Sequence, residues 1–182
     1  GTTPEYLSKT IELVKDLPIE PPVKKNMSVV TSLSQAVEIG PKPVIIGERI
    51  NPTGKKKFKQ ALRDGDINYI LSEGLKQEDA GAHILDVNVG LPEIDEPKMM
   101  VEVMKKLQSV IALPLQIDTS DPIALEAALR HYNRKAMINS VNGKQESMDA
   151  DSPLVQKYAG VVVGLALDED GIPDNAADRI RI

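Results

Sequence analysis

The chain has 182 residues and a net charge of −5 at pH 7, with 41% hydrophobic and 27% charged residues, which is typical of a globular domain. This acidic balance argues against a general nucleic-acid or membrane-surface binder, because both partners attract clustered positive charge. Without cysteine, disulfides and thiolate metal sites are excluded, and with two histidines a zinc site within this stretch is not expected. No run reaches the roughly 18 apolar residues of a membrane span, and no basic-then-apolar leader opens the chain, so we expect a cytoplasmic protein.

The amino-terminal part is expected to be a helix followed by a linker. Thr3 is a suitable N-cap, Pro4 favours a first helical turn, and apolar residues then recur at helical spacing. Prolines at positions 18, 21 and 22, followed by two lysines, cannot continue a helix and have little to bury. We therefore assign residues 1–17 to a helix, 18–39 to an inter-domain linker and 40–182 to the main domain.

The main domain alternates between short apolar runs and longer amphipathic segments. Strands are predicted at 44–50, 83–89, 113–117, 136–139 and 161–167, and helices at 55–63, 67–80, 97–110, 122–132, 147–158 and 175–182. Each unit has the size of a strand with its crossover helix, so the pattern indicates an α/β fold with a parallel sheet and right-handed crossovers. Pro153 makes the helix over 147–158 the weakest of these predictions.

Two architectures fit five such units. About 140 residues follow position 43, whereas an eight-fold barrel takes about 250, so the segment is either five strands of a barrel or a complete doubly wound sheet. The doubly wound sheet is disfavoured because no glycine-rich loop follows the first strand. We therefore predict a (β/α)8 TIM-barrel type fold, truncated to about five strand–helix units.

Polar side chains stand where successive predicted strands end. Asp118 ends the third strand and Asn139 the fourth, and together a carboxylate and a carboxamide can meet a flat heterocycle that presents N–H donors and ring-nitrogen acceptors. The alternative is that Asp118 only caps the helix that opens at Pro122. Thr119, Ser120 and Asp121 are better placed for that capping.

Further polar residues follow the first two strands. Asp86 and Asn88 alternate with apolar residues, so both face the same side, where they line a ligand pocket or only bond neighbouring strands. Glu48 and Arg49 are either part of the site or a structural ion pair. Asn51 opens a Pro-Thr-Gly loop that can close over the pocket.

Two other groups of residues have simpler interpretations. Lysines at positions 55, 56, 57 and 59 form a solvated helix face or, alternatively, attract a carboxylate-bearing tail of a ligand. His83 and His131 are expected to be packed or exposed and not catalytic.

Four segments, taken together, resemble the pterin-binding family. They are Ile46-Gly-Glu-Arg-Ile-Asn-Pro-Thr-Gly54, Leu85-Asp-Val-Asn-Val-Gly90, Leu115-Gln-Ile-Asp118 and Ala136-Met-Ile-Asn-Ser140. The resemblance covers about 140 residues, and Gly-Glu-Arg-Ile-Asn points to the methyltransferase branch over the dihydropteroate synthases. It implies that Asp118 and Asn139 bind the pterin ring, with Asp86, Asn88, Asn51 and Glu48 at the same mouth.

The first residues are similar to the segment that follows the zinc ligands of the homocysteine-binding domain in cobalamin-dependent methionine synthases. This resemblance implies that residues 1–17 are the tail of that domain, and that methyltetrahydrofolate passes its N5 methyl group to cobalamin held by another domain. Zinc would belong only to the upstream domain. Alternatives are a corrinoid-protein methyltransferase, a dihydropteroate synthase-like enzyme and an inactive half barrel. We expect weak or no folate binding by this chain alone, no activity alone, and a homo-oligomer through exposed barrel edges.

Overall fold

We describe a computed structural model of the chain, which covers residues 2–21, 23 and 25–182. Gly1, Pro22 and Lys24, which fall in the predicted terminal helix and linker, lie outside the described residues. The helices are α1 (Pro4–Val14), α2 (Lys56–Asp64), α3 (Ile67–Asp79), α4 (Glu96–Val110), α5 (Pro122–His131), α6 (Gln145–Tyr158) and α7 (Ala176–Arg181). The strands are β1 (Ser28–Thr31), β2 (Ala36–Ile39), β3 (Ile46–Ile50), β4 (Ile84–Val87), β5 (Leu115–Asp118), β6 (Met137–Asn142) and β7 (Val161–Leu165).

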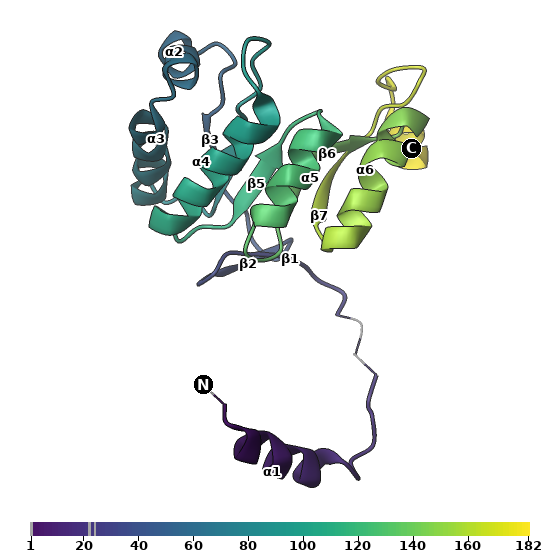
Figure 1. Cartoon of the computed structure of the whole chain (residues 1–182). Coiled ribbons are helices and arrows are strands. Elements are labelled where there is room, and N and C mark those ends of the chain that lie inside the picture. Colours follow the sequence, from purple (N-terminus) through teal and green to yellow (C-terminus); the bar gives the residue numbers. More distant parts are fainter. Residues whose placement is uncertain (1, 22, 24) are drawn as a thin grey trace.

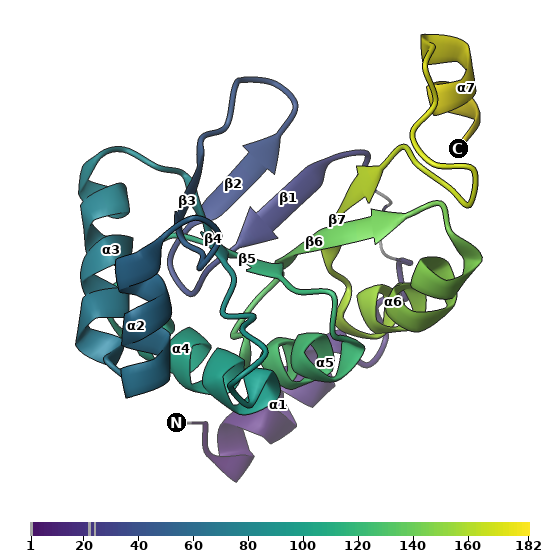
Figure 2. The same ribbon diagram turned by 90° about the horizontal axis from the view of Figure 1, so that it is seen from above.

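Strands β3 to β7 form a parallel sheet in which each strand pairs with the next one along the chain. Helices α2 to α6 connect these strands and lie together on one face of the sheet (Figure 2). Strands in sequential order, each followed by a helix on the same face, are the repeating unit of an eight-fold barrel. The predicted fold is confirmed: the chain has a truncated TIM-barrel type fold with five strand–helix units.

The helix-covered face holds the main hydrophobic core. Alternate residues of the inner strands, such as Leu85 and Val87 on β4 and Leu115 and Ile117 on β5, are no more than 1% exposed and pack against the helices. The partners from α4 and α5 include Met100, Val103, Met104, Leu107, Leu125 and Ala128. All four residues of β4 are buried, including Asp86, so both faces of this strand are covered.

The opposite, inner face changes character along the strands. At its amino end Ile84 and Met137 form a second apolar cluster with Val30 of the hairpin. One pleat further along, Asp86 takes the position above Ile84 on the same face. The inner face is therefore apolar where the strands begin and polar where they end.

The hairpin β1–β2 corrects part of the predicted linker. Residues 28–39 form an antiparallel pair beneath the sheet (Figure 1), and Val30 is fully buried. Thr31 fixes the hairpin, because its backbone N–H donates to Lys135 O at 2.9 Å and its carbonyl accepts from Tyr132 Oη at 2.8 Å. The hairpin is not predicted from the sequence, because its strands have only four residues each and follow a proline-rich stretch.

Helices α1 and α6 differ from expectation only in detail. Figure 1 shows α1 apart from the sheet, and none of its described residues is buried. Helix α6 begins at Gln145 and continues through Pro153. Proline is tolerated there because Pro153 and Asp149 are both exposed, so water can satisfy the carbonyl left without its helical N–H. Among the described helices, none is both long and apolar enough to cross a membrane.

Candidate functional site

The polar residues predicted from the strand ends converge at the carboxyl edge of the sheet. Asp118 on β5 is the register partner of Asn139 on β6, and Asp86 on β4 is the register partner of Gln116 on β5. Parallel pairing brings the carboxyl ends of neighbouring strands to one edge, so residues far apart in the sequence meet there.

Asp118 is the hub of the outer part of this cluster. Its Oδ2 accepts hydrogen bonds from Asn88 Nδ2 at 3.1 Å and from Asn51 Nδ2 at 3.4 Å. Asn51 is 4% exposed, and its Nδ2 also lies 3.5 Å from Glu48 Oε1. The carboxylate is therefore held by amides from two different strand ends, and Asp118 remains partly exposed and is one of the residues that line the pocket described below.

Asp86 lies deeper and has a different environment. It is 2% exposed, its Oδ1 accepts from the side-chain amide of Gln116, and Asn139 Nδ2 lies 3.5 Å from the same oxygen. Burial, together with the nearby Asp118 carboxylate, raises the pKa of Asp86 to about 7, although hydrogen bonds from the two amides act in the opposite direction. Asp86 therefore keeps its proton to a higher pH than an ordinary aspartate does.

The loop after β5 performs the helix capping considered as the alternative role for Asp118. Asp121 is the N-cap of α5, and its side chain accepts from Ile123 N at 2.8 Å. Thr119 Oγ1 accepts from Asp121 N at 3.0 Å and donates to Glu96. Asp118 is thus not used for capping and is available to a ligand.

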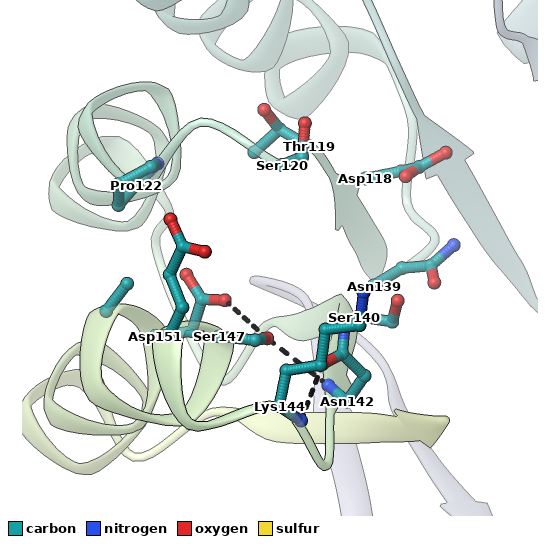
Figure 3. A pocket seen from close by; sticks show the side chains of 12 residues that line it. Asp118, Thr119, Ser120, Pro122, Asn139, Ser140, Asn142, Lys144, Ser147 and Asp151 are labelled. Carbon is teal, nitrogen blue, oxygen red and sulfur yellow. Dashed lines mark hydrogen bonds between the residues drawn. The ribbon is translucent and has the colours of Figure 1, made fainter. Parts of the chain in front are cut away.

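A pocket of about 380 Å³ opens beside this edge, between the loop after β5, the end of β6 and helix α6. Figure 3 shows Asp118 and Asn139 next to each other at one side of the pocket, with their polar ends directed away from α6, which carries Asp151 at the other side. Ser147 Oγ lies 3.3 Å from Asp151, and burial raises the pKa of this aspartate. Lys144 is the cation among the lining residues. The pocket can therefore accept a polar, flat molecule and offer a positive charge at its rim.

Some predicted neighbours lie elsewhere. Glu48 is exposed, and the ion pairs found among residues 2–21, 23 and 25–182 do not join it to Arg49, whose N–H is bonded to Gln77. Lys57 lies over the ring of Tyr69, and the other lysines of its cluster do not line the pocket. His83 Nδ1 accepts from the backbone N–H of Ile45, just before the neighbouring strand β3, and His131 Nδ1 lies 2.8 Å from the Ala127 carbonyl of its own helix.

Two residues of the site were missed from the sequence. Gln116 is buried against Asp86, and its position two residues before Asp118, on the same strand face, was the signal that could have found it. Lys144 could not be found because it lies in a loop that only the fold brings to the pocket. Within the described part of the chain, no three histidine, cysteine or acidic side chains are grouped to hold a metal ion.

The family follows from a comparison with family models. The model of pterin-binding enzymes matches residues 47–178, which include the whole polar edge. The chain belongs to the pterin-binding enzyme family. The predicted membership of the pterin-binding family is thereby confirmed.

Relatives of this pterin-binding chain are of two kinds. It is 28% identical over 189 aligned residues to a methionine synthase of Mycobacterium tuberculosis, in an alignment that covers all of this chain and 16% of that protein. A dihydropteroate synthase of Burkholderia cenocepacia matches 84% of the chain and 51% of its own length, with a TM-score of 0.51 and 19% identity. A Xanthomonas albilineans dihydropteroate synthase with 4-aminobenzoic acid covers 69% of the chain and 49% of its own length, with 22% identity and a TM-score of 0.48. The chain thus spans about a sixth of the curated relative, and the dihydropteroate synthase from Burkholderia supports the fold alone.

Proposed function

We propose that this chain is the methyltetrahydrofolate-binding part of a cobalamin-dependent methionine synthase. One observation carries the proposal: Asp118 and Asn139 lie side by side on the wall of one pocket, and Asp118 is held there by amides and not used in a helix cap (Figure 3). The similarity of the whole chain to a methionine synthase supports the methyltransferase branch. The Gly-Glu-Arg-Ile-Asn segment that begins at Gly47 supports the same branch.

The chemistry requires a pterin ring to be held by its polar edge. The Asp118 carboxylate accepts N–H groups in charge-assisted hydrogen bonds, and the Asn139 amide can both donate and accept. Asn51, Asn88 and Asp86 order these two side chains from behind. Lys144, which lines the pocket, is placed to attract an acidic tail of the ligand.

The methyl transfer itself is a displacement at the N5 methyl carbon. In the intact enzyme the carbon–nitrogen bond would break as the methyl group is passed to a reduced cobalamin held by another domain, and the leaving amine would have to be protonated or hydrogen-bonded. The share of this chain is to position the ring and to exclude misaligned approaches. Cobalamin would be presented by a separate cobalamin-binding domain, and zinc would serve homocysteine activation in an upstream domain.

The sheet also suggests how copies of the chain meet. Strands β3 and β7 are the two edges of the parallel sheet, and an unpaired strand edge favours pairing with another chain. We propose association through these edges when the chain is isolated. Light scattering tests this directly, and a monomer at all concentrations would contradict it.

Pterin binding can be tested by titrating methyltetrahydrofolate into ¹⁵N-labelled chain, because chemical shifts report weak binding as well as tight binding. We expect the side-chain amide signals of Asn139, Asn88 and Asn51 to move. The Asp118→Asn variant should bind at least about tenfold more weakly, since a charge-assisted hydrogen bond is replaced by a neutral one. The same pair of proteins, made in the intact polypeptide with cobalamin, should show the loss in methyl transfer.

Asp121 provides the matched control. The Asp121→Asn variant makes the same chemical change three residues further along, and asparagine is an equally good N-cap, so α5 is preserved. This variant should bind methyltetrahydrofolate like the unmodified chain. Equal binding by both variants would show that Asp118 does not contact the ligand. Preferential binding of 4-aminobenzoic acid, with pterin, would instead favour a dihydropteroate synthase-like enzyme.

A further inference from the structure

Two hydrogen-bond acceptors beneath the pocket are buried and have no donor among the described residues. They are Asp86 Oδ2 and Gln116 Oε1. Their side chains are register partners on β4 and β5, only 2% and 5% exposed, and already joined through Gln116 Nε2 and Asp86 Oδ1. Buried acceptors without donors are rare, because the hydrogen bond lost with water is not replaced.

A single proton between Asp86 Oδ2 and Gln116 Oε1 gives both oxygen atoms a hydrogen-bond partner. A protonated carboxyl group is a donor through one oxygen and an acceptor through the other, and a primary amide has the same two capacities. The two groups can then form a closed ring of two hydrogen bonds, which an ionised Asp86 cannot do because it only accepts. Exchanging the amide oxygen and nitrogen of Gln116 would place two acceptors against each other, so that orientation also needs a proton between them.

We propose that Asp86 carries a proton on Oδ2 in the folded protein and donates it to Gln116 Oε1. The two side chains then form a closed acid–amide pair, and Gln116 becomes a positioning residue for the pterin site. It acts through Asp86, whose Oδ1 faces Asn139 Nδ2 at 3.5 Å. Asn139 in turn stands on the pocket wall.

The charges around Asp86 favour the same state. The groups that face Asp86 are the Asp118 carboxylate from β5 and the neutral Asn139 amide from β6. The acidic residue on β3 is Glu48, which is linked to Asp118 through Asn51. No cation bonds Asp86 among the described residues, and burial has already raised its pKa to about 7. A neutral Asp86 leaves Asp118 as the carboxylate charge that a pterin edge would meet.

This inference deepens the proposed function, but its first test needs no ligand. At about pH 6, well above the ordinary pKa of an aspartate near 3.9, infrared spectra of the 182-residue chain minus those of Asp86→Asn should show the carbonyl band of one protonated acid. The Gln116→Met variant, which keeps the side-chain size, should move this band to higher frequency because the acid loses its amide partner. If the chain shows no acid band at this pH, the proposal is overturned, whatever the folate results.

A second aspartate–glutamine pair supplies the control. On α6, Gln145 Nε2 donates to Asp149 Oδ1 at 2.7 Å, but both residues are exposed. The Asp149→Asn difference spectrum should therefore show loss of a carboxylate and no acid band. An acid band there as well would mean that the signal does not report burial, and would overturn the assignment to a closed pair.

The positioning role is tested by the ligand and by Asn139. With Gln116→Met, the side-chain amide hydrogens of Asn139 should exchange with solvent at least about tenfold faster, and methyltetrahydrofolate should bind at least about fivefold more weakly. Affinity in the unmodified chain should fall as pH rises through about 7, where Asp86 loses its proton.

If folate binds but neither Asn139 exchange nor affinity responds to Gln116→Met, the positioning role fails while the proposed function stands. If no protein binds folate but the acid band is present, the proposed function fails and the pair stands.

Discussion

The two ends of the inner sheet face show how one strand serves two purposes. At the amino end Ile84 is fully buried under the hairpin, next to Val30 and Met137. Two residues further along β4, Asp86 is nearly as buried but lies among carboxyl and amide groups. Apolar packing at the amino end stabilises the fold, so the polar end does not have to contribute to stability. The polar end can therefore keep groups whose burial costs free energy.

The largest effect is expected at the apolar end. Replacing Val30 by aspartate places an unpaired charge at a fully buried position, and the free energy of unfolding should fall by about 4 kcal/mol or more. Urea unfolding followed by circular dichroism measures this loss. Ala36→Asp, on an exposed position of the same hairpin, should change it by no more than about 0.5 kcal/mol. Equal losses would mean that packing of Val30 against the sheet does not contribute to stability.

A cavity at Ile84 on β4, in the same apolar cluster as Val30, should lower the free energy of unfolding by somewhat less. Ile84→Ala removes a fully buried side chain from the inner face, and we expect a loss of about 2–4 kcal/mol in the same unfolding experiment. The control is Ile123→Ala on α5, where the side chain is 70% exposed and the loss should stay below about 0.5 kcal/mol. A loss under about 1 kcal/mol for Ile84→Ala would show that the apolar end is loosely packed.

The polar end should reveal itself through pH. The pKa of Asp86 is raised from 3.8 to about 7 in the folded chain, so between these values the folded state keeps a proton that the unfolded state has released. The contribution of Asp86 therefore favours folding less and less as pH rises from about 4 to about 7, by at most about 1.4 kcal/mol per pH unit. In Asp86→Asn this contribution should vanish. Identical pH profiles for the two proteins would contradict the raised pKa.

The smallest effect is expected at the helix cap. Asp121→Ala removes the side chain that accepts the Ile123 N–H, and the free energy of unfolding should fall by about 1 kcal/mol. Asp118→Ala leaves this helix cap intact, so its effect should appear in ligand binding. Faster hydrogen exchange of the Ile123 amide in Asp118→Ala, but not in Asp121→Ala, would reverse the roles assigned to the two carboxylates.

Local rules predicted much of this molecule because they concern neighbours in the chain. Pro122 with Asp121 marks a helix start wherever it stands, and the run from Leu113 to Ile117 indicates a buried strand. The positions of Asp118 and Asn139 at strand ends were enough to predict that they meet. The hairpin around Val30 was missed because its burial depends on strands that follow it by many residues.

Periodicity and strand direction along the chain are enough to predict the order of strands and helices, the parallel sheet and the edge at which polar side chains gather. Which of these polar groups stay exposed and which become buried depends on the packing of the folded chain. Asp86 and Asp118 have the same side chain at the ends of neighbouring strands, yet one lines the pocket and the other is enclosed with Gln116. The difference arises from desolvation, which depends on everything packed around a residue and not on its neighbours in the chain.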